Sequence, residues 1–367
     1  MECHPRVGGD DKIDFFYFEI PAFAGMTIFL PLTTYYLLLT TMNNIGIIGL
    51  GHCLPERVLT NHDLEKLVDT SDEWITTRTG IKERRIADKG TNNSDLATQA
   101  GIEAIKAANL TPADIELIIV TTISPDSNFP SVACLVQKAI KADNAAAFDI
   151  SAACSGFLYG ITTAKQFLQS GMYKNALVIA SEKITDLIDW NDRGTCVLFG
   201  DGAGACVLGE VDGGHGIIAD FMHAQGEFGE LMAVKNENRL PLDQKKQLIQ
   251  LPYVVMQGKE LFKIAVNSMA LAVEKALEKA GLKLSDIDLV VPHQANDRII
   301  TAVAKKLDVP KDKFFINIHK YGNMSAASIA VALYEAEKQG AVKKGDHVAL
   351  VTFGAGLVSA ANIVKWE

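Results

Sequence analysis

The chain has 367 residues, of which 48% are hydrophobic and 22% charged, and its formal net charge at pH 7 is −9. A chain of this length can bury a large core and is expected to hold two units of similar size. The negative charge argues against nonspecific nucleic-acid binding, and any basic partner site has to be local. The 6 cysteines lack CxxC or metal-type spacing, which indicates reduced thiols of a cytoplasmic protein and no metal site.

The first 41 residues differ from the rest of the chain. Residues 1–19 are polar, with Lys12 flanked by Asp10, Asp11 and Asp14, whereas a signal peptide needs a cationic start. Residues 26–41 are apolar but rich in threonine, and they are too short for a clear membrane span. We therefore expect residues 1–41 to be an appended segment outside the fold, with the true start at Met42. A targeting or anchoring role for this segment is the alternative.

From residue 42 onward the sequence repeats itself. Residues 104–119 align with residues 276–291 at an offset of 172, and residues 176–179 align with residues 348–351 at the same offset. Each half alternates amphipathic helices with short apolar strands, which is typical of an α/β fold with mostly parallel sheets. We predict two βαβαβ halves, at residues 42–213 and 214–367, related by a pseudo-dyad.

In the first half, an apolar strand at residues 145–150 leads directly to Cys154 at the start of a helix. A thiol at a helix N-terminus lies near unpaired N–H groups and the positive end of the dipole, which favour the thiolate. The alternative is a buried structural cysteine. The tract at residues 200–205, rich in glycine, lacks the residues of a phosphate-binding loop and is predicted to be a tight turn feeding a strand.

In the second half, His293 directly follows an apolar strand and Asn323 precedes a helix. Either residue could be purely structural, as a core histidine or a helix cap. Loops at the carboxyl ends of parallel strands carry ligand-binding and catalytic groups, so these two side chains and Cys154 are expected to converge where the halves meet. A nucleophile, an imidazole and a carboxamide together suit covalent acyl chemistry.

The motifs SAACSGF, DRGTCVLFGDGAGA, VPHQAN, YGNMSAAS and FGAG resemble those of the β-ketoacyl-acyl carrier protein synthase III family. The resemblance covers nearly all of residues 42–367. It implies the thiolase fold, with central mostly parallel sheets and buried helices, and a homodimer. It also implies the condensation that initiates type II fatty acid synthesis. In that reaction an acyl-CoA primer, expected to be acetyl-CoA, and malonyl-acyl carrier protein give 3-ketoacyl-acyl carrier protein, CoA and CO2.

The resemblance also assigns roles to residues of this sequence. Cys154 would carry the acyl group, His293 and Asn323 would complete the triad, and the backbone N–H groups of Cys154 and Ala355 would form the oxyanion hole. No cofactor is implied, because the CoA thioester is a substrate. The implied CoA-binding residues are Thr70, Trp74, Arg78, Arg193 and Asn296. Phe129 would close the acyl pocket across the dimer interface. The implied carrier-protein face consists of Lys263, Gln294, Arg298, Lys305 and Lys306.

The sequence bears on four alternatives to this activity. A thiolase uses a second cysteine near the C-terminus, but the last cysteine of this chain is Cys206. A hydrolase must admit water to the acyl-enzyme, and the apolar setting of Cys154 argues against this. A carrier-protein binder without enzymatic activity would not need the full set of reactive groups. A related condensing enzyme of quinolone, polyketide or long-chain ketone synthesis, using the same triad, stays open.

Overall fold

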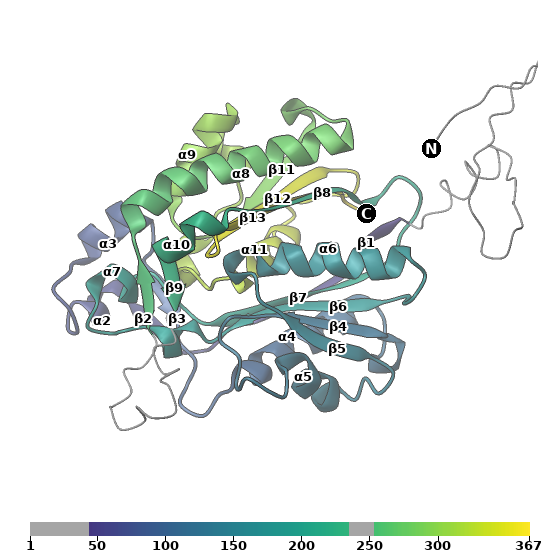
Figure 1. The fold of residues 1–367 in the computed structure, drawn as a ribbon, viewed down its shortest axis with the longest axis horizontal. Helices are drawn as coiled ribbons and strands as arrows, with labels where there is room; N and C mark the ends of the chain where they lie inside the picture. Colours follow the sequence, from purple (N-terminus) through teal and green to yellow (C-terminus); the bar gives the residue numbers. More distant parts are fainter. Residues whose placement is uncertain (1–43, 235–252) are drawn as a thin grey trace, which may run out of the picture. The chain divides into compact units, whose positions relative to one another are not determined.

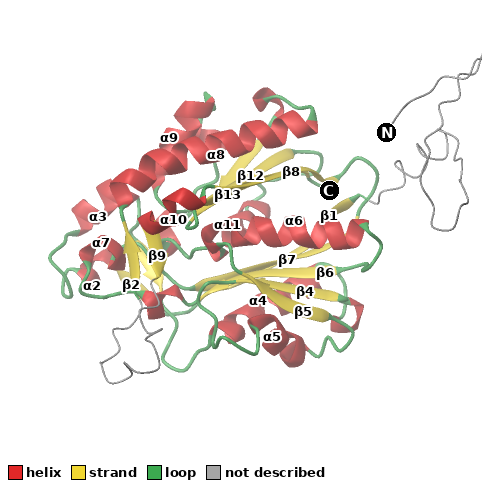
Figure 2. Cartoon of the chain, viewed as in Figure 1, coloured by secondary structure: helices red, strands yellow, loops and turns green. Residues whose placement is uncertain are grey.

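The computed structural model describes residues 44–234 and 253–367, and two β-sheets form its framework (Figures 1 and 2). The predicted appendage at residues 1–41 lies outside the described residues. The first sheet consists of β1 (Ile45–Cys53), β7 (Gly202–Glu210), β6 (Ala176–Glu182), β4 (Leu117–Thr121) and β5 (Ala146–Ile150), in that order. The second consists of β11 (Leu289–Pro292), β12 (His347–Gly354), β13 (Val358–Lys365) and β8 (Gly216–Ala224).

The two sheets have equivalent strand orders. The order β1-β7-β6-β4 in the first corresponds to β8-β13-β12-β11 in the second, and an isolated parallel bridge between Val290 and Phe314 stands beside β11 as β5 stands beside β4. Every strand of the first sheet comes from residues 45–210 and every strand of the second from residues 216–365. The repeat in the sequence thus appears as a repeat in strand order, while the division into halves at residue 213 stays a prediction.

Helices fill three layers around these sheets, as Figure 1 shows. The helices α6 (Gly156–Gln169) and α11 (Ala327–Lys338) lie between the sheets, packed into one core with the inner faces of both. The outer face of the first sheet is covered by α4 (Asn93–Ala107) and α5 (Val132–Ile140), and that of the second by α8 (Gly258–Ala280) and α9 (Asp297–Leu307).

The helix α6 is buried because its apolar residues recur along almost its whole length. Phe157, Leu158, Ile161 and Ala164 are all fully buried. Each large apolar side chain of this kind stabilises the folded state by about 1.5–3 kcal/mol. This burial fixes the N-terminus of α6, and with it the turn that contains Cys154.

Parallel pairing is found where the βα repeat predicts it. The strands β4, β5 and β6 run parallel to one another, and β11 runs parallel to β12. The remaining pairings, of β7 with β6 and β1 and of β13 with β12 and β8, are antiparallel. The β12–β13 pair is antiparallel because only residues 355–357 join the two strands, too few for a helical crossover.

The tract at residues 200–205 feeds a strand, as predicted, but the turn lies just before it, at residues 197–198, and Gly202 and Gly204 already belong to β7. The tract does not lead into a helix, as a phosphate-binding loop would. A Cβ at Gly204 would lie 2.5 Å from the Cβ of Ala330 in α11. The glycine therefore lets the central helix approach the strand closely.

Shorter elements gather at one side of the sheets, on the left of Figure 1. They are β2 (Val58–Thr60), α2 (Asn61–Leu64), α3 (Asp72–Thr79), β3 (Glu83–Arg85), α7 (Arg193–Cys196), β9 (Met232–Val234), β10 (Val254–Met256) and α10 (Ile318–Tyr321). Within the described ranges, no helix is both long and apolar enough to cross a membrane.

Candidate active site

Cys154 lies in a single turn, Ala153–Ser155, between β5 and α6, and only 3% of the residue is exposed. The end of β12 packs directly against this turn. A Cβ at Gly354 would lie 2.7 Å from the Cys154 nitrogen, so only glycine allows this approach. Residues from both halves of the chain therefore meet at Cys154.

Burial raises the pKa of the Cys154 thiol to about 12. Burial therefore opposes the effect expected of the helix N-terminus, which favours the thiolate. Removal of the sulfur from water disfavours the charged form more strongly than the nearby groups favour it. The thiol rests neutral, and it needs a proton acceptor when it reacts.

A cavity of about 400 Å³ opens beside Cys154. Ala355 and Ser325 line it together with Cys154, and Ala355 does not have a positive φ. Cys154 and Ala355, which are predicted to supply the N–H groups of the oxyanion hole, thus line the same cavity. Most other lining side chains are apolar, which suits a short acyl chain: Ile123, Tyr159, Ile184, Met232, Val254 and Val358.

His293 directly follows β11 and is 2% exposed. Its backbone N–H donates to the Val351 carbonyl of β12 at 2.8 Å, which places it at the same end of the sheet as Gly354. Burial lowers the pKa of the imidazole to about 3, and its Nδ1 has no hydrogen-bond partner among the described residues. The ring is therefore neutral at physiological pH and can donate a hydrogen bond without carrying a charge.

Asn323 is held by its backbone and by the acceptor atom of its side chain. Its N–H donates to the Leu198 carbonyl at 2.8 Å, and its Oδ1 accepts from the Ser325 N–H at 2.8 Å. The side chain does not cap α11, whose N-cap residue is Ala326. The amide NH2 is left as the donor that Asn323 offers, and Ser325 connects Asn323 to the cavity at Cys154.

Trp74, in α3, lies between two arginines at the surface. The Arg78 guanidinium carbon is 5.2 Å from the centre of the Trp74 ring, and that of Arg193 is 5.0 Å from it. Arg193 also donates to the Asp69 carbonyl at 2.8 Å, and the Thr70 hydroxyl is buried without a partner in the described part of the chain. Four of the predicted CoA-binding residues, Thr70, Trp74, Arg78 and Arg193, thus form one cluster. Because Arg193 lies close to the indole ring, a flat ligand could stack between Trp74 and Arg193 only if Arg193 moved.

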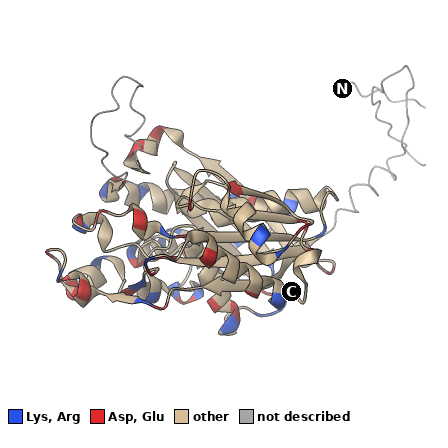
Figure 3. Ribbon diagram, turned by 90° about the horizontal axis from the view of Figure 1, so that it is seen from below, with Lys and Arg blue, Asp and Glu red and all other residues tan. Residues whose placement is uncertain are grey.

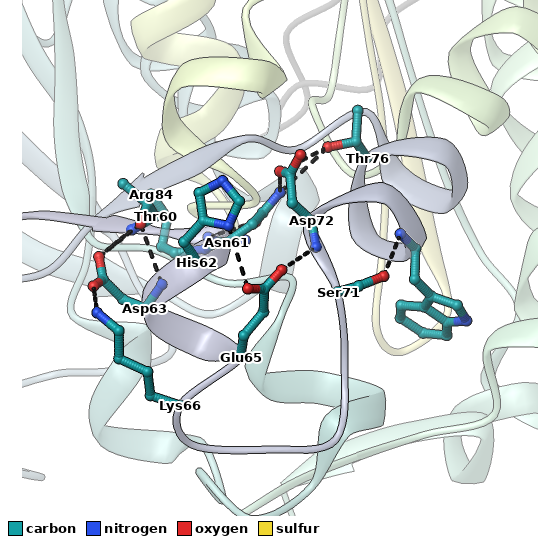
Figure 4. A network of polar contacts seen from close by, with 11 residues as sticks. Thr60, Asn61, His62, Asp63, Glu65, Lys66, Ser71, Asp72, Thr76 and Arg84 are labelled. Atoms are coloured by element: carbon teal, nitrogen blue, oxygen red, sulfur yellow. Dashed lines mark hydrogen bonds and ion pairs between the residues drawn. The ribbon is translucent and has the colours of Figure 1, made fainter.

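A buried polar network holds α3 in place (Figure 4). Asn61 donates to the Asp72 carboxylate at 2.8 Å, and its Oδ1 accepts from the Arg84 guanidinium at 2.9 Å. Arg84 also donates to the Val197 carbonyl at 2.7 Å, just after α7. Arg84 therefore links the helix that carries Trp74 to the segment that carries Arg193.

Two residues predicted to bind substrates are engaged elsewhere. Gln294 is 1% exposed, and it bonds to the backbone of Pro292, Phe315, Asn317 and Ile318. The prediction that Gln294 contacts a carrier protein is therefore wrong, because its position is internal. Asn296 caps α9 through the Arg298 N–H, and its Nδ2 donates to the Arg78 carbonyl, so the structure uses it to join α9 to α3.

The other predicted contact residues lie at the surface. Lys263, Arg298, Lys305 and Lys306 are exposed on α8 and α9, and the Arg298 guanidinium lies 5.9 Å from the centre of the Phe262 ring. Basic and acidic residues are interspersed over the whole structure, as Figure 3 shows. Phe129 is 85% exposed and does not line the cavity of its own chain.

Sequence reasoning missed two buried residues next to Cys154. Ser325 lines the cavity, and Glu182 ends β6 with none of its surface exposed. A carboxylate at the end of the apolar run Ala176–Glu182 was the available signal, because an unpaired acid is costly to bury. Metal-type clusters of three or more His, Cys, Asp or Glu are absent from residues 44–234 and 253–367.

Comparison with known proteins gives consistent matches. Residues 148–226 match the family described as 3-oxoacyl-[acyl-carrier-protein (ACP)] synthase III, and residues 277–366 match its C-terminal family. A β-ketoacyl-[acyl-carrier-protein] synthase III of Caldanaerobacter subterraneus is 53% identical over 88% of this chain and 98% of that protein. The corresponding protein of Aquifex aeolicus is 52% identical over 87% of this chain and 99% of that protein.

Solved structures agree with these matches. The crystal structure of 3-oxoacyl-[acyl-carrier-protein] synthase III from Aquifex aeolicus has a TM-score of 0.83 and 52% identity over 88% of this chain and 100% of that one. The priming β-ketosynthase of the R1128 polyketide pathway has a TM-score of 0.83 and 35% identity over 89% and 97%. The predicted thiolase-like α/β fold is confirmed. The extent and level of identity show that the chain belongs to the β-ketoacyl-[acyl-carrier-protein] synthase III family.

Proposed function

We propose that the chain joins an acyl-CoA primer to malonyl-acyl carrier protein by decarboxylating condensation, with Cys154 carrying the acyl group. Members of its family are condensing enzymes of the acyltransferase class that start fatty acid synthesis. The observation that carries the proposal is a buried thiol on an apolar cavity that also contains Ala355 and lies next to the loop of Asn323. A covalent thioester there would be shielded from water.

In the first half-reaction, the Cys154 sulfur attacks the carbonyl carbon of the acyl-CoA thioester. The tetrahedral intermediate carries an oxyanion, which preorganised N–H donors stabilise. The backbone N–H groups of Cys154 and Ala355 are the donors proposed for it. Collapse of the intermediate leaves acyl-Cys154 and expels CoA.

In the second half-reaction, malonyl-acyl carrier protein loses CO2 and leaves negative charge on its thioester oxygen. The neutral imidazole of His293 and the amide of Asn323 are proposed to donate to that oxygen. Uncharged donors suit this step, because they stabilise the enolate without adding a buried charge. The enolate carbon then attacks acyl-Cys154 and gives the 3-ketoacyl product.

The cluster of Trp74, Arg78 and Arg193 is proposed to bind the nucleotide of CoA, with Thr70 beside it. A guanidinium binds phosphate oxygens in a fork geometry, and an indole ring stacks on a base. The basic surface of Arg298, Lys263, Lys305 and Lys306 is proposed to bind the acidic carrier protein. No resident cofactor is needed in this scheme, because the CoA thioester is itself a substrate.

We further propose a cytoplasmic homodimer with acetyl-CoA as the primer. The support for a dimer is Phe129, whose large apolar side chain is 85% exposed. In a dimer this side chain would be covered and could close the acyl pocket of the partner subunit.

The test is the intact mass of the purified protein after incubation with a panel of acyl-CoAs. We expect an increase equal to one acyl group, largest for the preferred primer, and none in Cys154→Ser. Addition of malonyl-acyl carrier protein should discharge the acyl group and give 3-ketoacyl-acyl carrier protein. No mass increase with any acyl-CoA would contradict the proposed function.

The panel also tests the second candidate, a priming ketosynthase of another pathway. This candidate is supported by the similarity to the R1128 priming β-ketosynthase, at 35% identity. Preferential acylation by long-chain or aromatic acyl-CoAs over acetyl-CoA would support that candidate.

A further inference from the structure

Glu182 is a fully buried acid that the proposed half-reactions leave without a role. Its Oε2 accepts hydrogen bonds from the Ser124 hydroxyl, from the Ile123 N–H at 3.1 Å and from the Thr122 hydroxyl at 3.2 Å. Its Oε1 has no partner, and the residue forms no ion pair with any described residue. One carboxyl oxygen is thus anchored and the other is left available.

Ser325 stands where it can connect Glu182 to Cys154. It is fully buried, its φ is +49°, and it lines the same cavity as Cys154. Its hydroxyl has no well-aligned hydrogen bond to any described residue. Ile123, whose N–H donates to Glu182, lines this cavity too, so Glu182 lies beside the cavity that Cys154 and Ser325 share. Burial raises the pKa of the Cys154 thiol and of the Glu182 carboxyl, and the Ser325 hydroxyl partly lowers both pKa values.

The Ser325 hydroxyl and Glu182 Oε1 are both without a hydrogen-bond partner in the described part of the chain, as a route for a proton from Cys154 would require. We infer that Glu182 is a positioning residue that takes the Cys154 proton through the Ser325 hydroxyl during acyl transfer and returns it during condensation. The inference rests on the proposed function for its biological role. The proposed proton transfer from Cys154 to Glu182 needs no substrate, so it can be tested in the protein alone.

In acyl transfer, a bond forms from the Cys154 sulfur to the acyl carbon. The thiol proton moves to Ser325 Oγ while the Ser325 proton moves to Glu182 Oε1. The bond from the acyl carbon to the CoA sulfur then breaks, and the CoA thiolate takes a proton from water.

In condensation, the bond from malonyl carbon to its carboxylate breaks and releases CO2. The carbanion forms a bond to the acyl carbon, and the bond to the Cys154 sulfur breaks. The proton held by Glu182 returns through Ser325 to that sulfur. One proton is consumed per turnover, which matches the conversion of the malonyl carboxylate into CO2.

Burial, and not a neighbouring charge, lets the Glu182 carboxyl exchange a proton near physiological pH. Burial raises its pKa to about 7. Among the titratable groups around β6, Lys183 pairs with Asp186, and Asp201 accepts from Ala87 and Thr185. On the neighbouring elements, Lys165 of α6 pairs with Asp220, and Cys206 of β7 is a neutral buried thiol. Cys154 is the group whose pKa Glu182 directly affects.

The experiment measures the rate at which iodoacetamide alkylates Cys154, located by peptide mass, from pH 5.5 to 9. In the unsubstituted protein the rate should rise with an inflection near the Glu182 pKa of about 7, because the carboxylate accepts the proton only above it. Glu182→Gln and Ser325→Ala should each remove this inflection and slow alkylation at pH 8 at least about tenfold, as for loss of a general base. Glu182→Asp should retain an inflection.

Glu103→Gln is the matched control, since Glu103 is a half-buried acid bonded to His52 and Tyr334 and away from the cavity. It should leave the pH profile unchanged. An unchanged inflection in a folded Ser325→Ala protein would overturn the inference even if Glu182→Gln failed to fold. Because alkylation needs no acyl-CoA, this outcome is separate from failure of the proposed function, which would show as absent acylation by every acyl-CoA.

Discussion

At Cys154 and His293, burial shifts the pKa of an acid and of a base in opposite directions. Burial raises the pKa of the thiol to about 12 and lowers the pKa of the imidazole to about 3, so both groups rest uncharged. A neutral resting site avoids the cost of burying an unpaired charge. It also means that charge develops only during the reaction, when preorganised donors stabilise it.

The division of labour between these residues can be tested by substitution. We expect His293→Ala and Asn323→Ala to block decarboxylation of malonyl-acyl carrier protein while still permitting acylation of Cys154. Loss of one oxyanion-type donor typically costs about 10²–10³ in rate. Release of labelled CO2 measures decarboxylation, and intact mass measures acylation of Cys154. Complete loss of acylation in a folded variant would show that the roles are assigned wrongly.

The imidazole also affects acid stability. The pKa of His293 is about 3 in the folded protein, against its ordinary value of 6.5, because of burial. Below pH 6.5 the unfolded state binds a proton that the folded state does not, so this residue lowers stability as pH falls from 6.5 towards 3. We expect His293→Asn to have a shallower fall in Tm over this range. Parallel Tm-against-pH curves for the two proteins would contradict this.

At the scale of elements, the residues proposed to act together lie at the ends of strands and helices or in the short segments between them. Cys154 precedes α6, His293 follows β11 and Gly354 ends β12. These positions were predictable, because apolar runs and the repeat identify the strands. The acidity of Cys154, the burial of Gln294 and the contacts of Glu182 and Ser325 were not, because each depends on packing between residues far apart in the chain.

The helix α3 offers a prediction at this scale, since the Asn61–Arg84 network positions the helix that carries Trp74. We expect Asn61→Ala to destabilise the protein by about 1–3 kcal/mol, as for a buried donor left without its partner. It should also raise KM for acyl-CoA but not for an acyl-pantetheine, which lacks the nucleotide. The exposed neighbour His62 provides the control, and His62→Ala should change neither KM. An equal rise for both substrates would indicate a general loss of structure.

At the scale of the whole molecule, a chain of net charge −9 is proposed to bind an acidic carrier protein. Long-range attraction is therefore absent, and a local basic surface has to supply the binding energy. The exposed basic side chains of α8 and α9 lie on the outer face of the second half, and Arg298 is placed beside Phe262.

Charge reversal tests this surface. We expect Arg298→Glu to raise KM for malonyl-acyl carrier protein at least about tenfold, as two close charges change from attraction to repulsion. Acylation by acyl-CoA should stay unchanged. Lys275→Glu is the matched control, because Lys275 lies twelve residues beyond Lys263 on the same helix, about 18 Å away. Weaker use of acyl-CoA with intact use of the carrier protein would refute the docking surface.

The close approach of Gly354 to Cys154 has a consequence for how such a molecule could arise. The nucleophile belongs to one copy of the repeat, and the strand that presses against it belongs to the other. A solitary ancestral copy would have carried an incomplete reaction centre and required a second copy to complete it. Joining two copies in one polypeptide would let each specialise, one for the proposed nucleophile and the other for the proposed imidazole and amide donors.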